Sequence, residues 1–121
     1  MTQKKILYIE DNPDNRMLVK RVLEAENYQI LEASSGQEGI SLAAETKPDL
    51  ILIDINLPDI DGYEVTRRLR KISHIANTPI LAMTANVMKG DREKTLQAGC
   101  DYYIRKPIDI DLLPHQIAEY V

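Results

Sequence analysis

The sequence is poor in cysteine and histidine. Its 121 residues include one cysteine, Cys100, and two histidines. A single cysteine cannot form an internal disulfide, and the chain has no Cys/His cluster with the spacing of a zinc site. This usage is typical of a reducing compartment, so we expect a cytoplasmic protein.

Long apolar runs and an excess of basic residues are also absent. The wholly apolar runs are short, as in Ile6 to Ile9, whereas a membrane span needs about 20 residues. The charged start, Met1 to Lys5, leads into only a few apolar residues, so no secretory signal is expected. The net charge is -4, which gives no basic footprint for a nucleic acid. We therefore expect no membrane insertion and no direct binding to DNA or RNA.

Tryptophan and phenylalanine are missing, and six tyrosines supply all the aromatic rings. We expect most of these tyrosines to be partly buried, with their hydroxyl groups in water. There is no low-complexity tract and no internal repeat at solenoid spacing. At this length the chain is expected to form one domain over residues 1–121, with a single core.

Short apolar runs alternate with segments of helical periodicity along the whole chain. The runs predict strands over residues 5–9, 29–33, 50–53, 80–83 and 102–105. Five strands that alternate with five helices predict an α/β fold, a parallel sheet covered on both faces and joined by right-handed crossovers. The expected architecture is a doubly wound, flavodoxin-like (βα)5 sandwich with strand order 2-1-3-4-5.

Capping residues mark where several of these helices begin. Asn12 precedes a proline, Ser35 has a glutamate three residues later, and Asp61 precedes Gly62 and Glu64. The apolar stripes that we expect on the helices are Met17, Leu18, Val22 and Leu23; Ile40, Ala43 and Ala44; Val65, Leu69 and Ile72; and Leu113, Ile117 and Ala118.

The fourth and fifth helices are less regular. The segment 86–98 is interrupted by Gly90 and should end at Gly99, so we expect it to be the mobile helix. In the last helix Pro114 has to lie in the first turn, because a proline further in would distort the helix.

Polar residues gather where the strands end. Glu10 and Asp11 follow the first strand, Asp54 the third, Thr84 the fourth and Lys106 the fifth. In this fold ligands bind beyond the carboxyl ends of the strands, and the first and third strands are neighbours. Three carboxylates brought together repel one another unless a cation intervenes, and Mg2+ suits a few carboxylates combined with a phosphate. The pattern therefore predicts a site for metal and phosphoryl oxygens.

Phosphoryl transfer needs a nucleophile and compensation for negative charge on the phosphoryl oxygens. Asp54 is the candidate nucleophile, which would form an aspartyl phosphate. The ammonium group of Lys106 and the hydroxyl group of Thr84 could each bind one phosphoryl oxygen, and the metal a third.

These residues, with Leu-Pro-Asp-Ile-Asp-Gly at 57–62, Ala85 after Thr84 and Pro107 after Lys106, resemble the receiver domain of two-component response regulators, the CheY-like superfamily. The resemblance covers essentially the whole chain. Segments 88–91 and 98–101 look more like single-domain regulators of the DivK type and hybrid-kinase receivers than like chemotaxis receivers.

The resemblance implies a role for each of these positions. Asp54 would be the phosphoacceptor, Glu10 and Asp11 the acidic pair, and the backbone carbonyl of Asn56 a further metal ligand. Thr84 would be the switch hydroxyl, Lys106 the phosphate-binding lysine and Tyr103 the switch aromatic residue. A cis peptide is implied at Lys106-Pro107. Mg2+ is the expected ion, with Mn2+ as an alternative.

The resemblance also implies a signalling function. The phosphoryl group would come from a phosphohistidine of a histidine kinase or a histidine phosphotransfer protein. It would be hydrolysed slowly, so the chain is a phosphoacceptor with intrinsic self-phosphorylation chemistry rather than an enzyme. The surface of the fourth helix, fifth strand and fifth helix would then contact a downstream protein. We expect a monomer or a weak phosphorylation-dependent dimer, either as a stand-alone regulator or as the receiver of a hybrid kinase.

Three other functions compete with this one. A metal-dependent phosphohydrolase with an aspartate nucleophile needs a second acid two residues later, where this sequence has Asn56. A pseudo-receiver that only docks partners usually lacks part of the acid set, which is complete here. Flavin binding on the same fold is not supported, because no Gly/Ser/Thr-rich phosphate-binding loop follows the first strand.

Individual residues also have structural interpretations. Glu10, Asp11 and Thr84 could be helix caps, and Tyr103 could be a fixed core residue as well as a switch. We interpret His74 and His115 as surface residues, and Cys100 as a packed thiol.

Overall fold

A computed structural model describes residues 3–85 and 91–121 of the chain. Its strands are β1 Lys5–Ile9, β2 Gln29–Ala33, β3 Leu50–Asp54, β4 Ile80–Thr84 and β5 Tyr102–Arg105. Its helices are α1 Pro13–Glu24, α2 Gly36–Glu45, α3 Gly62–Arg70, α4 Asp91–Ala98 and α5 Leu113–Ala118, with a short 3-10 helix η1 at Ser73–Ile75.

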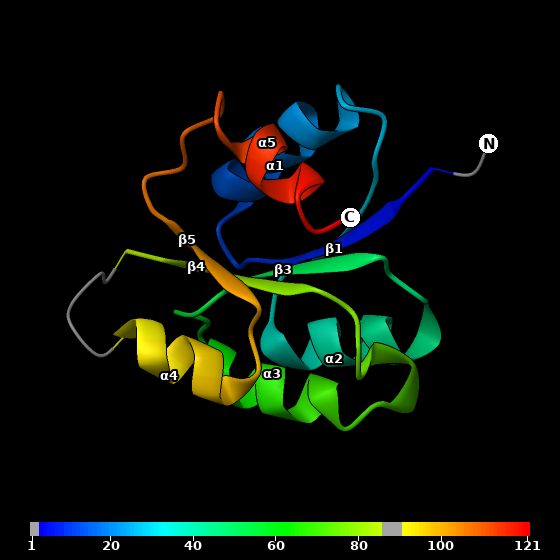
Figure 1. Ribbon diagram of the computed structural model, residues 1–121, viewed down its shortest axis with the longest axis vertical. Helices are drawn as coiled ribbons and strands as arrows, with labels where there is room; N and C mark the ends of the chain where they lie inside the picture. The colour runs from blue at the N-terminus through cyan, green and yellow to red at the C-terminus, as the bar shows by residue number, and fades with distance from the viewer. Residues whose placement is uncertain (1–2, 86–90) are drawn as a thin grey trace.

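The five strands form one parallel sheet in the order β2-β1-β3-β4-β5. Figure 1 shows α1 and α5 on one face of this sheet and α2, α3 and α4 on the other. Both the α/β class and the strand order predicted from the sequence are confirmed. Because β1 and β3 are neighbours, their carboxyl ends lie side by side at the same edge of the sheet.

Alternate residues of the strands build a separate core on each face of the sheet. Residues such as Leu7, Ile9 and Ile53 pack towards α2 and α3, whereas Ile6, Tyr8 and Leu52 pack towards α1 and α5. The central strands β1, β3 and β4 are buried on both faces, which explains their uninterrupted apolar sequences. The sheet is therefore a rigid support for the residues that follow its strands.

The predicted caps are present at three helix starts. The side chain of Asn12 accepts hydrogen bonds from Asp14 N and Asn15 N, and Pro13 is the first residue of α1. The side chain of Ser35 accepts from Glu38 N at α2, and that of Asp61 accepts from Glu64 N at α3. These caps satisfy N–H groups that have no partner within the helix.

Four residues of the expected apolar stripes are exposed, which corrects that part of the prediction. Met17 and Leu18 are 52% and 41% exposed, because α1 turns Val19 and Leu23 to the core instead. A helix rotates about 100° per residue, so direct neighbours of a buried residue can face water. For the same reason Ala44 beside buried Ala43 is exposed, and so is Ala118 beside buried Ile117.

The last two helices agree with the sequence where the structure describes them. Helix α4 ends at Ala98, and Gly99 follows with a positive φ of 111°. Gly99 N donates to Leu96 O and Cys100 N to Thr95 O, which is the hydrogen-bond pattern of a glycine-terminated helix. Pro114 lies in the first turn of α5, as predicted. The start of the segment 86–98 and Gly90 lie outside the described residues, and the expected mobility stays a prediction.

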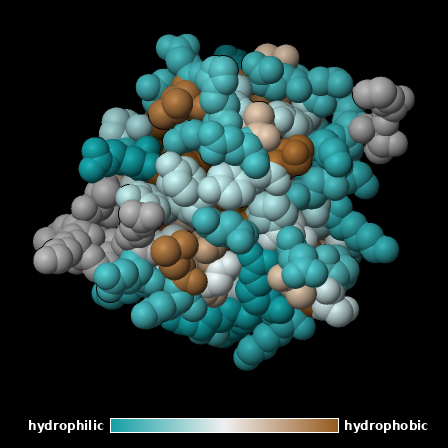
Figure 2. Space-filling model, in the orientation of Figure 1, coloured by the Kyte–Doolittle hydropathy of each residue, from teal (hydrophilic) through white to brown (hydrophobic). Residues whose placement is uncertain are grey.

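None of the helices in the described ranges has the length and apolar character that a membrane crossing requires. The face drawn in Figure 2 is largely hydrophilic, with small separate apolar patches.

Candidate functional site

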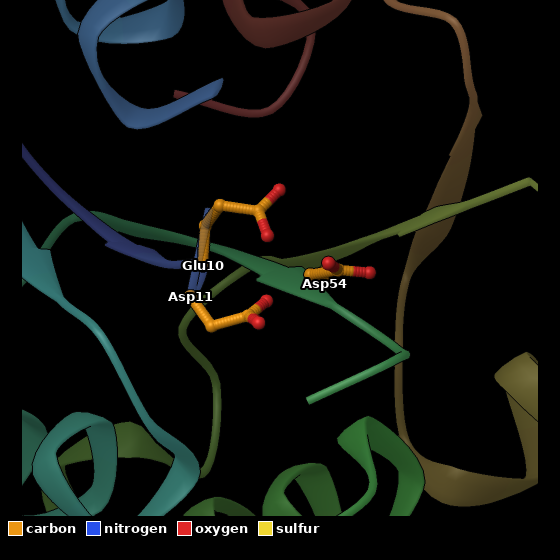
Figure 3. Close-up of side chains that lie close together, drawn as sticks. All are labelled: Glu10, Asp11 and Asp54. Carbon is orange, nitrogen blue, oxygen red and sulfur yellow. The ribbon is translucent and has the colours of Figure 1, made fainter. Parts of the chain in front are cut away.

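Three carboxylates meet at the carboxyl ends of β1 and β3. Glu10 and Asp11 follow Ile9, and Asp54 follows Ile53, its neighbour across the sheet. Figure 3 shows the three side chains around one space, and one oxygen of each lies within 4.8 Å of the others. Glu10 is 1% and Asp54 3% exposed, whereas Asp11 is exposed. The predicted acid cluster is thus assembled by the sheet.

Lys106 reaches this cluster from the end of β5. Its Nζ atom lies 3.0 Å from Asp54 Oδ2 and 3.2 Å from Glu10 Oε1, and its side chain is 18% exposed. Its backbone N–H donates to Thr84 O, which fixes the segment after β5 against the end of β4. Three carboxylates and one ammonium group leave a formal charge of -2 when all are ionised. That charge matches a divalent cation, so the residues fit a Mg2+ site.

Neighbours that the sequence analysis did not identify hold Glu10 in place. Tyr8 Oη and Asn15 Nδ2 each donate to Glu10 Oε1 at 3.3 Å, and Asn12 N donates to Oε2 at 3.4 Å. Arg16 also donates to the Glu10 carbonyl oxygen at 2.6 Å. Helical spacing could not have identified Asn15 and Arg16, because Glu10 lies before the start of α1.

The backbone after β3 holds the carboxylate of Asp54. Asn56 N donates to Asp54 Oδ1 at 3.0 Å, while Lys106 approaches Oδ2. The next residue, Ile55, donates its N–H to Met83 O and so extends the contact with β4. Both oxygens of Asp54 therefore have a partner, and the side chain has a fixed orientation.

The two buried acids have pKa values shifted in opposite directions. Burial raises the pKa of Glu10, and the adjacent Asp54 raises it further. Burial also works to raise the pKa of Asp54, but hydrogen bonds from Glu10, from Lys106 and from the Asn56 N–H outweigh it and lower that pKa. Without a metal, Glu10 therefore takes up a proton at a higher pH than Asp54 does, and Asp54 is the acid that ionises more readily.

The pKa of Lys106 is raised. Burial opposes this shift, but the ion pairs with Asp54 and Glu10 are stronger. The ammonium group is therefore charged at neutral pH and offers hydrogen-bond donors at the acid cluster.

Thr84 and Tyr103 lie on neighbouring strands next to this site. Thr84 is buried at the end of β4. Tyr103 on β5 is half-buried and pairs with Ala82, a small residue two positions before Thr84. Its ring stacks on Tyr102, with ring centroids 5.7 Å apart. The Lys106-Pro107 peptide is cis, as the resemblance implied.

The remaining candidates lie away from the acids. His74 and His115 are exposed, as expected, and His74 Nε2 lies 2.8 Å from Ala43 O at the end of α2. Cys100 is buried against Thr66, as expected for a packed thiol.

Comparison with known proteins identifies the family. The family model of the response regulator receiver domain matches residues 6–118. The polar-differentiation response regulator DivK of Brucella ovis is 41% identical over 118 residues, which cover 98% of this chain and 96% of DivK.

Two solved structures are also similar. The receiver domain of sensor histidine kinase PA1611 from Pseudomonas aeruginosa, with a magnesium ion coordinated in its active site cleft, has a TM-score of 0.91 and 34% identity, covering 98% of both chains. The receiver domain of Ssk1 from Saccharomyces cerevisiae, crystallised with the histidine phosphotransfer protein Ypd1, has a TM-score of 0.89 and 26% identity. That match covers 98% of this chain and 88% of the other. This chain belongs to the response regulator receiver domain family.

Proposed function

We propose that this protein is a phosphorylation-dependent switch that accepts a phosphoryl group on Asp54. The observation that carries the proposal is the position of Asp54, a buried carboxylate with a lowered pKa that lies beside Glu10 and the Lys106 ammonium group. An ionised oxygen can attack phosphorus, and the neighbouring charges can stabilise the phosphoryl oxygens. Asn56, in place of a second acid, disfavours the phosphohydrolase alternative.

Glu10, Asp11, Asp54 and the backbone carbonyl of Asn56 are the residues that would hold Mg2+, with Mn2+ as an alternative. The ion would supply positive charge next to the phosphoryl oxygens. The formal charge of -2 at the cluster supports this assignment. A magnesium ion in the similar PA1611 receiver domain also supports it.

The chemical step exchanges one bond of phosphorus for another. An oxygen of Asp54 bonds to phosphorus while the phosphorus–nitrogen bond of a phosphohistidine breaks, and its electron pair stays on the imidazole. Lys106 binds one phosphoryl oxygen, and the Thr84 hydroxyl group donates to another. The acyl phosphate is later hydrolysed by water, so the protein returns to its starting state.

The phosphodonor is proposed to be a histidine kinase or a histidine phosphotransfer protein. A hollow of about 280 Å3 opens next to Lys106 and is lined by Asn15, Leu18, Lys106, Pro107 and Ile108. Leu18 on α1, Pro107 and Ile108 give this hollow an apolar surface. Such a surface suits the apolar side chains of a partner helix. The Ssk1 receiver domain, a similar structure, was crystallised with the phosphotransfer protein Ypd1.

The output is proposed to pass from Thr84 to Tyr103. A phosphoryl group on Asp54 would draw the Thr84 hydroxyl group towards it, and the Tyr103 ring would turn into the space that is left. The change would reach the surface of α4, β5 and α5. The phosphoryl group can shift this equilibrium only by its different interaction with the two states, typically about 1–3 kcal/mol.

Intact mass spectrometry with acetyl phosphate and Mg2+ tests the proposal. Wild-type protein should gain one phosphoryl group that hydroxylamine removes, and Asp54→Asn should gain none. Tyr103→Ala should be labelled like wild type but bind a phosphorylation-dependent partner less tightly. Equal labelling of Asp54→Asn would contradict the site, and steady multiple turnover on a phosphate ester would favour the phosphohydrolase.

A further inference from the structure

The loop that follows Asp54 is closed at its base. Ile55 N donates to Met83 O, and Gly62 N donates to Ile55 O at 2.9 Å, so the two ends of the segment 56–61 meet. A β-carbon at Gly62 would lie 2.6 Å from Ile55 Cα, too close for any other residue. Asn56, whose carbonyl is a proposed metal ligand, is the first residue of this closed loop.

The tip of the loop is held by Asp59. Asp59 Oδ1 accepts from Gly36 N at 2.9 Å, and Oδ2 accepts from Gln37 N at 3.0 Å. These are the first two N–H groups of α2, and the third, that of Glu38, donates to Ser35 Oγ. Asp59 and Ser35 thus share the N-terminus of α2, one from a distant loop and one from the adjacent residue.

The contact between the loop and α2 is also close-packed. A β-carbon at Gly36 would lie 2.7 Å from Val65 Cγ2 and 3.3 Å from Ile60 Cβ. Val65 belongs to α3 and Ile60 to the loop, so a larger residue at position 36 would displace both from the start of α2. The two backbone donors lower the pKa of Asp59, which agrees with bonds made to its charged form.

We propose that Asp59 is a positioning residue for the metal site, which it affects by holding the loop that carries the Asn56 carbonyl. The inference rests on the proposed function, because it concerns the proposed Mg2+ ligands. Each of the two carboxylate oxygens binds one N–H, so the tether fixes both the position and the tilt of the loop. Outer residues that orient metal ligands typically change metal affinity by about 10–100-fold when they are replaced.

Titration calorimetry with MgCl2 alone tests this role in wild type, Asp59→Ala, Asp59→Asn and Ser35→Ala. Asp59→Ala should weaken Mg2+ binding about tenfold, the lower end of that range, since Asp59 acts through three residues of backbone. Asp59→Asn keeps one acceptor oxygen and should give an intermediate value. Ser35→Ala removes the other side-chain cap of α2 without touching the loop, so its Mg2+ affinity should equal that of wild type.

Two further measurements separate positioning from loss of structure. Thermal unfolding without metal should show that both Ala variants remain folded at the titration temperature. Hydrogen exchange of the Asn56 amide should become faster in Asp59→Ala only. Unchanged affinity in Asp59→Ala, or equal weakening in Ser35→Ala, would overturn the inference while leaving the proposed function intact. If wild type itself binds no Mg2+, both are wrong.

Discussion

Partners around each buried polar group decide its charge in this protein. Glu10 and Asp54 are both acids at neighbouring strand ends, yet their pKa values move in opposite directions. Hydrogen bonds from Glu10, from Lys106 and from Asn56 N outweigh the burial of Asp54 and lower its pKa. Burial raises the pKa of Glu10 and the neighbouring Asp54 raises it further, although Lys106 acts in the opposite direction. Two carboxyl groups in different surroundings are therefore suited to different roles: Asp54 to attack phosphorus, and Glu10 to hold a proton or a metal.

Cys100 shows the same principle in an apolar setting. Its thiol is 4% exposed and lies 3.6 Å from Thr66 Oγ. Burial raises its pKa to about 11, although Thr66 and Arg70 act in the opposite direction. At pH 8 the thiolate fraction should be about 100-fold lower than in the unfolded chain, and the thiolate is the reactive form. We expect slow labelling by a disulfide reagent in native protein and rapid labelling in concentrated urea.

The ionisation of Cys100 makes the free energy of unfolding fall as the pH rises. A pKa raised from 9.0 to about 11 means that the native state keeps a proton that the unfolded state loses. The resulting stability is present below pH 9 and is lost as the pH rises towards 11. Cys100→Ala should therefore reduce the loss of stability in that window, measured by urea unfolding at both pH values. Native labelling at the unfolded rate at pH 8 would contradict the burial argument.

At the scale of the element, the side chain of Arg70 links the C-terminal end of α3 to its neighbours. Arg70 Nε donates to Gly99 O at 2.9 Å, and its Nη1 donates to Ile75 O and Thr78 O at 2.9 and 2.6 Å. Its Nη2 donates to Asp101 Oδ2, which also accepts from Ile80 N. One guanidinium group therefore joins α3 to the end of α4, to η1 and to the starts of β4 and β5.

Arg70→Ala should lower the free energy of unfolding by about 2–4 kcal/mol, because several acceptors lose a charged donor at once. The free energy of unfolding of Arg70→Lys should lie between those of wild type and Arg70→Ala, since one ammonium group cannot reach all of these oxygens. Arg67→Ala is the matched control on the same helix, where the side chain is exposed and pairs only with Glu64 in the described contacts. Its effect should be small. Urea unfolding measures all three, and equal effects of Arg67→Ala and Arg70→Ala would refute the network.

Local patterns predicted the elements well and their long-range contacts poorly. Caps such as Asn12 and Ser35 act within a few residues, so spacing along the sequence is enough to find them. The contacts of Asp59 with α2 join residues 22 or 23 positions apart, and the periodicity of apolar residues along the sequence does not predict them. The exposed Ala44 has a related cause. Gly39 brings α2 close to Ile9 of β1. The buried residues of α2 are Gly36, Gly39 and Ala43, and Ala44 lies outside this strip.

The acid cluster could be predicted because a parallel sheet brings the carboxyl ends of its strands to one edge. Asp54 and Thr84 end strands, and Glu10 and Lys106 directly follow strands, so the strand order was enough to place these residues together. Tyr8 and Asn15, which bind the Glu10 carboxylate, were missed since their roles depend on side-chain direction rather than on position in the chain.

At the scale of the whole molecule, metal binding and folding should be coupled. The ligands come from the ends of β1 and β3, which meet only in the folded sheet, so the unfolded chain should bind Mg2+ weakly. An ion that binds only the native state adds about 2.7 kcal/mol to the free energy of unfolding at 100 times its Kd. Urea unfolding in Mg2+ and in EDTA should differ by this amount.

Asp11→Asn separates this coupling from any general effect of salt. Asp11 is exposed, so replacing it should change stability in EDTA little, whereas it removes one of the three carboxylates from the cluster. The variant should therefore lose most of the Mg2+ increment and keep the stability of the metal-free protein. An increment as large as that of wild type would mean that Mg2+ stabilises the fold from somewhere other than the ends of β1 and β3.

A single unfolding transition with and without the ion would show that the strand ends and the rest of the sheet unfold together, as coupling through one core requires.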